Sequence, residues 1–128
     1  MKKNELIAVI LMLLCTIGAI VGVFGIEKYR RARFYTLELV ARAPEHGNWY
    51  PKEFTLPVNE EATILIRNIE TVTHGFAVPD FNVAAGEIKA GEAITVKFTP
   101  DKKGKFPFMC TVWCSEHHME MRGEITVE

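Results

Sequence analysis

The sequence lacks the signatures of most small-molecule enzymes. It has no glycine-rich phosphate-binding loop and no Gly-x-Ser-x-Gly turn, which argues against nucleotide chemistry and against a hydrolase nucleophile. Only three cysteines and four histidines occur among 128 residues. A chain of this length forms one globular domain rather than two, so a substrate pocket with its own catalytic apparatus would have little room.

Net charge is nearly absent overall but is strongly uneven along the chain. Residues 1–33 contain six basic and two acidic side chains, a net charge of +4. Residues 34–128 contain nine basic and fourteen acidic side chains, a net charge of −5. An acidic body would repel the phosphates of a nucleic acid. The composition therefore argues against a nucleic-acid partner and favours a basic partner or a cation.

Charged residues are also missing from Leu6 to Ile26, a run of 21 residues. As a helix this run would rise about 31 Å, enough to cross the hydrocarbon core of a bilayer. A cleavable signal peptide is the alternative, but it usually has a shorter apolar region that ends in a small-x-small site. We therefore predict that residues 1–33 form a membrane anchor with a basic linker, and that residues 34–128 form a separate domain.

The charges on the two flanks of this run leave its orientation in conflict. Four basic residues follow it, whereas only Lys2, Lys3 and the amino terminus precede it. Taken literally, the positive-inside rule places the acidic body in the cytoplasm.

Beyond the linker, apolar residues alternate with polar ones, which predicts short β-strands. The alternating runs include residues 35–39, 63–67, 94–98 and 123–127. Turn signals fall at residues 44–48, 57–60, 85–86, 90–91 and 99–104. About seven short strands without an amphipathic helix predict an all-β fold, a Greek-key β-sandwich or barrel preceded by one transmembrane helix.

The main chemical signal lies in residues 110–121, which gather two cysteines, two histidines and two methionines. Thiolate, imidazole and thioether form a soft ligand set that suits copper better than magnesium, calcium or manganese. A further histidine, His74, follows an upstream strand, so two loops could supply ligands from both sides of one end of the sandwich. His46 lies in a loop rich in proline, glycine and asparagine and is expected to be solvated.

Other readings of these residues remain open. A disulfide between Cys110 and Cys114 would leave the nearby histidines and methionines unexplained. A zinc site could use two cysteines and two histidines, but methionine adds nothing to it. A copper chaperone of the thioredoxin-like type would need βαβ units. A mononuclear blue-copper site would leave Cys110 without a role and would use His74, Cys114, either His117 or His118, and Met121.

The spacing Cys110-x-x-x-Cys114-x-x-x-His118-x-x-Met121, with His74-Gly-Phe upstream, resembles the binuclear copper A (CuA) site of cytochrome oxidase subunit II and nitrous oxide reductase. Residues 118–123 are especially similar to the nitrous oxide reductase version. The single short anchor is closer to the small subunit II of some bacterial and archaeal oxidases. The resemblance covers the chain from about Leu37 to the C-terminus and implies a cupredoxin fold.

Carried over residue by residue, the resemblance implies two copper ions per chain. Six groups would hold them: the bridging thiolates of Cys110 and Cys114, the imidazoles of His74 and His118, and two weak ligands, Met121 and the backbone carbonyl of Val112. In the family an acidic residue commonly lies three positions before the first histidine. Here Thr71 occupies that position and Glu70 comes one residue earlier. Val112 stands where the family often has a polar or aromatic residue.

The resemblance implies an electron-transfer protein without a catalytic site of its own. It would accept electrons from a cytochrome c-like donor and pass them to a terminal reductase, as subunit II beside subunit I of a haem-copper oxidase. A stand-alone carrier related to nitrous oxide reductase is the alternative. Because such donors lie outside the cytoplasmic membrane, we expect the body on the periplasmic or extracellular side of a single-pass anchor. Exposed aromatic residues such as Trp49, Tyr50 or Trp113 would lie near the donor, although Trp49 could equally belong to the core.

Overall fold

The computed structural model describes residues 2–128, and for residues 31–34 it describes the backbone alone. The chain divides into two compact units, Met1–Phe34 and Tyr35–Glu128. The first unit consists of the helix α1 (Lys3–Phe34). Within the described chain, α1 is the helix that is long and apolar enough to cross a membrane, over Lys3–Arg30. The predicted apolar helix is therefore present.

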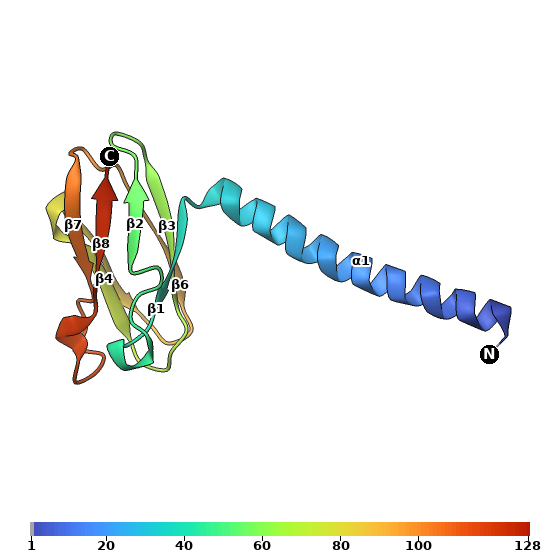
Figure 1. Cartoon of the computed structure of the whole chain (residues 1–128). Coiled ribbons are helices and arrows are strands. Elements are labelled where there is room, and N and C mark those ends of the chain that lie inside the picture. Colours follow the sequence, from blue (N-terminus) through green and yellow to red (C-terminus); the bar gives the residue numbers. More distant parts are fainter. Residues whose placement is uncertain (1) are drawn as a thin grey trace. The chain divides into compact units, whose positions relative to one another are not determined.

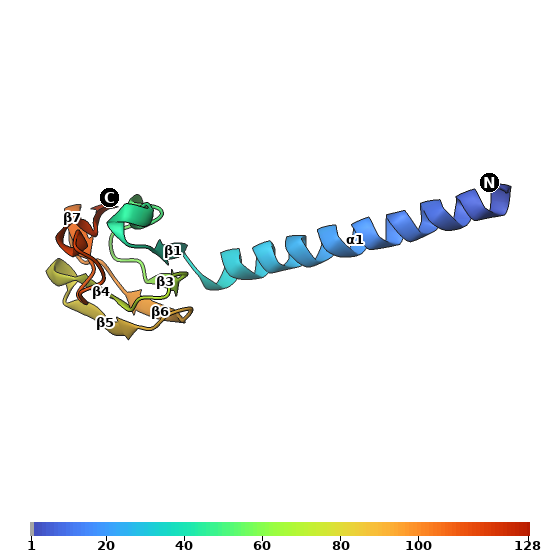
Figure 2. The same cartoon turned by 90° about the horizontal axis from the view of Figure 1, so that it is seen from below.

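The second unit is a β-sandwich of two sheets (Figure 1). Its strands are β1 (Leu37–Ala41), β2 (Glu53–Leu56), β3 (Ala62–Asn68), β4 (His74–Val78), β5 (Val83–Ile88), β6 (Ala93–Phe98), β7 (Gly104–Met109) and β8 (Arg122–Val127). One sheet has the order β1-β3-β6 and the other the order β2-β8-β7-β4-β5. Figure 2 shows β1, β3 and β6 facing β7, β4 and β5. The predicted all-β sandwich with one N-terminal helix is thus confirmed.

One predicted turn is wrong. Residues 85–86 lie inside β5, and the pairing of β5 with β4 shifts register between Phe76 and Ala77. Gly86 has a φ of +70°, in the left-handed region that glycine adopts at little cost. The shift is a β-bulge, and a glycine in a bulge gives the same local sequence signal as a glycine in a turn.

Aromatic side chains fill the centre of the sandwich. The ring centroid of Trp49 lies 5.8 Å from that of Phe76 and 5.6 Å from that of Phe108. Only 1% of Trp49 is exposed. The core reading of Trp49 is therefore confirmed and its proposed exposure near a donor is wrong, whereas Tyr50 and Trp113 are exposed as expected.

The two ends of the sandwich differ in what they carry. Thr36 and Glu128 lie at one end, where Thr36 bonds the backbone of Thr63 and Glu128 that of Leu56. The parallel pairing of β1 with β3 carries both strands to the opposite end, where His74 begins β4 and the connection between β7 and β8 lies (Figure 1). The predicted ligands are therefore gathered at the end away from Thr36 and Glu128.

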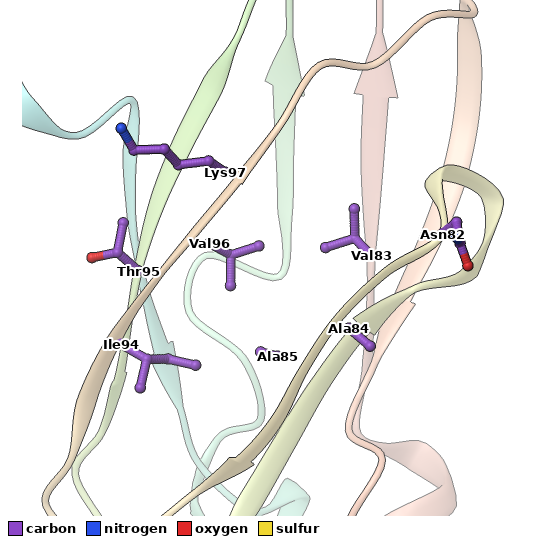
Figure 3. A pocket seen from close by; sticks show the side chains of 8 residues that line it. All are labelled: Asn82, Val83, Ala84, Ala85, Ile94, Thr95, Val96 and Lys97. Atoms are coloured by element: carbon purple, nitrogen blue, oxygen red, sulfur yellow. The ribbon is translucent and has the colours of Figure 1, made fainter.

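An open hollow of about 480 Å³ lies between the edge strands β5 and β6 (Figure 3). It is lined by Asn82 and by side chains of these two strands, such as Val83 and Val96. No thiol, imidazole or carboxylate lines it, so it offers nothing to a metal ion.

Replacement of Phe108 should test how much the sandwich depends on its aromatic centre. Phe108 is fully buried, and Phe108→Ala should lower the free energy of unfolding by about 3–5 kcal/mol because it leaves a cavity. Ile69 is 57% exposed, so Ile69→Ala should change the free energy of unfolding by less than about 0.5 kcal/mol. Urea titration followed by tryptophan fluorescence measures both. Equal, small effects would contradict this account of the core.

Candidate metal centre

The ligand loop, residues 110–121, joins β7 to β8. Its two ends are held together because the backbone N–H of Cys110 donates to the carbonyl of Met121 over 3.0 Å. The neighbouring pair Met109 and Arg122 are register partners in the antiparallel ladder. Near its end the loop forms a short 3₁₀ turn, η3 (His118–Glu120). Closure of this hairpin places Cys110 and Met121, the first and last predicted ligands of the loop, side by side.

The loop is also tied to the core through the carbonyls at its end. The indole N–H of Trp49 donates to the Met121 carbonyl over 3.3 Å. The side-chain amide of Asn48 donates to the Glu120 carbonyl over 2.9 Å. These two residues follow η1 (Pro44–His46), so the loop after β1 supports the ligand loop from one side.

The two thiols lie close together and are buried. The Sγ atoms of Cys110 and Cys114 are 4.0 Å apart, and both cysteines are free. A disulfide would require a separation of about 2.05 Å. In this structure the pair is therefore a dithiol that faces a shared space.

Histidine nitrogens lie beside each thiol. The Nδ1 atom of His74, which is fully buried, is 3.9 Å from the Sγ of Cys110. The Nδ1 atom of His118 is 3.5 Å from the Sγ of Cys114. The adjacent His117 instead has a 54% exposed side chain and contacts Glu120. The structure thus brings His118, and not His117, to the thiols.

The two remaining predicted ligands also reach this space. The Sδ atom of Met121 is 3.6 Å from the Sγ of Cys114. The carbonyl oxygen of Val112 is 3.2 Å from the Sγ of Cys110. All six predicted groups therefore converge at one end of the sandwich, where His74, Cys110, Cys114 and Met121 are buried and Val112 and His118 are half-buried.

Glu70 orients His74 through the ring nitrogen that does not face Cys110. One carboxylate oxygen is 2.8 Å from the Nε2 of His74 and accepts the backbone N–H of Ala43 over 2.7 Å. The other oxygen contacts the Nδ1 of His46. Glu70 lies one position earlier than the acidic residue that the resemblance implies, but His74 still has a carboxylate partner. His46 is exposed as expected, but it is paired with Glu70 rather than solvated alone.

Close approach of β4 to the ligand loop requires a glycine. A Cβ atom on Gly75 would lie 2.1 Å from the Oγ1 of Thr111, far inside van der Waals contact. The same residue donates its N–H to the Sγ of Cys110 over 3.3 Å. Gly75 therefore both admits the loop and supplies a hydrogen bond to a thiol.

Burial and the neighbouring groups act in opposite directions on the pKa values of this cluster. Burial lowers the pKa of His74, but Cys110 and Glu70 outweigh it and raise the value above 6.5. Burial raises the pKa of Cys110, but His74 and the Gly75 N–H outweigh it and lower the value. Burial, together with the adjacent Cys110, raises the pKa of Cys114 to about 12. A metal ion must displace the Cys114 proton, so binding should strengthen as pH rises.

The donor set and its spacing fit copper. A metal–thiolate bond is about 2.3 Å long, and the two sulfurs are 4.0 Å apart. An ion on either side of the line between the sulfurs can therefore bond to both. The cluster of His74, Cys110 and Cys114 keeps its ligand atoms within 4.8 Å of one another. Imidazole, thiolate and thioether are ligands that copper accepts together.

The residues that the sequence did not single out are those that hold the ligands. Asn68 is buried, and its side-chain amide donates to the carbonyls of Val72, Ile88 and Lys89. Its side-chain oxygen accepts the N–H of Glu70. Asn48 has a φ of 63°, which asparagine tolerates. Their only sequence signal is asparagine at the end of a strand or in a turn.

Removal of the Glu70 charge should weaken this end of the sandwich. Burial raises the Glu70 pKa, but its hydrogen bonds outweigh burial and hold the value below 4.5, so the carboxylate contributes stability above pH 4.5. That contribution is lost as pH falls through the folded-state value. We expect Glu70→Gln to lower the free energy of unfolding at pH 7 by about 1–3 kcal/mol.

Urea titrations at pH 7 and below pH 4 measure the effect of Glu70→Gln, and Glu87→Gln, on the exposed face of β5, is the control. The difference between Glu70→Gln and the unsubstituted chain should shrink at the lower pH. A difference that stays constant with pH would contradict the assignment to the carboxylate.

Residues 8–127 match the family described as the cupredoxin-like domain. Nitrous-oxide reductase of Cupriavidus necator is 36% identical over 103 residues, which are 78% of this chain but 15% of that protein. Cytochrome c oxidase subunit 2 of Thermus thermophilus is 29% identical over 94 residues, 73% of this chain and 66% of that protein.

The crystal structure of the periplasmic domain of subunit II of cytochrome oxidase from Bradyrhizobium japonicum superposes with a TM-score of 0.54 at 29% identity. It covers 59% of this chain and 54% of that one. The chain spans only about a seventh of the nitrous-oxide reductase that it matches. It belongs to the cupredoxin-like domain family and is related to nitrous-oxide reductases and to subunit 2 of cytochrome c oxidases.

Proposed function

We propose that this chain is a membrane-anchored electron-transfer protein with a binuclear CuA site. The observation that carries the proposal is the pair of buried thiols 4.0 Å apart, each with a histidine Nδ1 atom beside it. The proposed ligands are His74, Cys110, the carbonyl of Val112, Cys114, His118 and Met121.

The geometry favours this site over the alternatives. A blue-copper site needs one thiolate, which would leave the Cys110 thiol buried 4.0 Å from it without a function. A structural zinc site has no use for the Met121 sulfur, which lies 3.6 Å from the Sγ of Cys114. The thioredoxin-like chaperone reading conflicts with a body that is a β-sandwich.

The chain's own residues supply rigidity. Two coppers held by both thiolates would spread one electron over both metals. The hairpin closure between Cys110 and Met121 fixes the two ends of the ligand loop. Glu70 holds the His74 ring, and the Gly75 N–H supports the Cys110 sulfur. Ligands held in this way move little when the charge changes, which favours fast electron transfer.

The surface near the ligands fits a protein donor. Trp113 is 70% exposed, and its ring lies 5.7 Å from the ring of His118. Met119 in the same loop is also exposed. Residues 34–128 carry a net charge of −5, which would attract a basic, cytochrome c-like donor. The Trp113 ring therefore offers a contact between such a donor and the proposed site.

The proposed acceptor is a terminal reductase, with the chain acting as subunit II beside subunit I of a haem-copper oxidase. The apolar helix α1 supports this assignment, because a membrane-bound partner would need the domain to be anchored. A stand-alone carrier is the second candidate. It is favoured by the higher identity to nitrous-oxide reductase, 36% against 29% for the oxidase subunit of Thermus thermophilus.

The number of coppers is the first test of the proposal. The unsubstituted chain should bind two coppers and give the electron paramagnetic resonance of one electron shared equally between two copper nuclei. Cys110→Ser should abolish that signal as completely as Cys114→Ser, because either change opens the bridge. Met121→Leu should keep the copper and shift the reduction potential, as expected for a weak thioether ligand.

The adjacent histidines provide the matched control. His118→Ala should damage the signal far more than His117→Ala, because only the His118 ring faces a thiol. A single copper per chain, with hyperfine coupling to one nucleus, would overturn the binuclear proposal. So would a Cys110→Ser variant that keeps the colour of the unsubstituted chain.

The side of the membrane is the second test. We propose that the N-terminus faces the cytoplasm and the body lies outside, because a cytochrome c-like donor would meet it there. Lys2, Lys3 and the amino terminus would form the inside anchor despite the basic residues that follow α1's apolar part. A reporter that is active only outside the cytoplasm, fused after Glu128, should be active. Activity only of a cytoplasmic reporter at that position would contradict the proposal.

A further inference from the structure

A second cavity lies directly beside the proposed copper site. It measures about 280 Å³ and opens between three loops: the one after β1, the one between β3 and β4, and the ligand loop. Its lining residues are Ala43, Glu45, His46, Glu70, Thr71, Val72, Cys114 and Ser115. Of the proposed ligands, only Cys114 forms part of its wall, so the cavity connects one thiol to the surface.

The chemistry of the wall suits a cation. Glu45 and Glu70 both line the cavity, so two carboxyl groups lie on the path from its opening to Cys114. The Oγ atom of Ser115 is buried and has no hydrogen-bond partner among the described residues. His46 adds an exposed imidazole at the same opening.

We propose that this cavity is the route by which copper reaches the apoprotein, with Glu45, His46 and Glu70 attracting the ion and Cys114 receiving it first. The inference rests on the proposed function, because it assumes that copper is the metal bound. A cleft lined by charge of one sign raises the local concentration of the opposite ion and so speeds its capture. Two carboxylates leading to one thiol meet that condition.

The exposed part of the ligand loop around Trp113 and Met119, outside the cavity wall, offers the competing route. There the ring of Trp113 lies over that of His118, and Met119 is 65% exposed. Glu116 and Glu120 in this part of the loop are exposed, and Glu120 is paired with the imidazole of His117. Copper that passed on this side would meet His118 before either thiol.

Uptake of Cu(I) can be timed by stopped flow in the full chain in detergent, with both thiols reduced and oxygen excluded. Cu(I) in acetonitrile is the probe, and the rise of near-ultraviolet thiolate–copper absorption is the signal. Cys15 is an exposed third thiol in α1, so every chain carries Cys15→Ala. Copper bound per chain at the end point is measured separately.

A tryptophan in the cavity wall should block the route. Thr71→Trp should slow uptake at least about tenfold, because copper must then wait for a local opening of the loops. Ile69→Trp lies on the same exposed connection outside the cavity wall, and Met119→Trp lies on the competing side; neither should change the rate. The amount of copper bound at the end point should be the same in all three.

A charge variant keeps the test decisive if Thr71→Trp does not fold. Glu45→Gln should slow uptake severalfold and make the rate less sensitive to salt, whereas Glu87→Gln on β5 should do neither. Equal rates for Glu45→Gln, Thr71→Trp and their controls would overturn the route, as would slowing by Met119→Trp alone. An end point of one copper in the chain that carries Cys15→Ala alone would instead contradict the binuclear function, and the comparison of rates would still decide the route.

Discussion

The carbonyl of Met121 is the point on which the rest of this site depends. It accepts the backbone N–H of Cys110 and the indole N–H of Trp49, so one atom joins both ends of the ligand loop to the aromatic core. Trp49 is in turn packed against Phe76 and Phe108. A loop of twelve residues would otherwise have many conformations, and the entropy lost in ordering it would weaken metal binding. Here the loop is already ordered when the sandwich folds.

Glu70 plays the corresponding part for the ligand outside this loop. Its two oxygens serve a backbone N–H, a buried imidazole and an exposed imidazole, which is enough to keep a largely buried carboxylate charged. A buried carboxylate without such partners would take up a proton and lose its hold on His74. The same charge also lies in the wall of the cavity that reaches Cys114. One side chain therefore orients a ligand and shapes the potential that a cation would meet.

Sequence predicted the parts of this structure that follow from periodicity and donor chemistry. Alternation identified β3 and β6 to within a residue or two, because each strand has one face in the core. The clustering of cysteine, histidine and methionine located the proposed site. The sequence did not identify the bulge at Gly86 or the role of the side-chain amides of Asn48 and Asn68. A bulge and a turn share the same glycine signal, and a supporting asparagine looks like any loop residue until its distant partners are known.

The long-range contacts explain why the carboxylate that contacts His74 was harder to predict than the ligands. A ligand's identity is fixed by its own donor atom, whereas an orienting carboxylate needs only to reach the far nitrogen of the ring. Glu70 does so from four positions before His74, because the amide of Asn68 holds the connection between β3 and β4 in place. Sequence position is therefore a poor guide to an orienting group, and the loop conformation decides it. That conformation rests on the carbonyls of Ile88 and Lys89 at the end of β5, some twenty residues away along the chain.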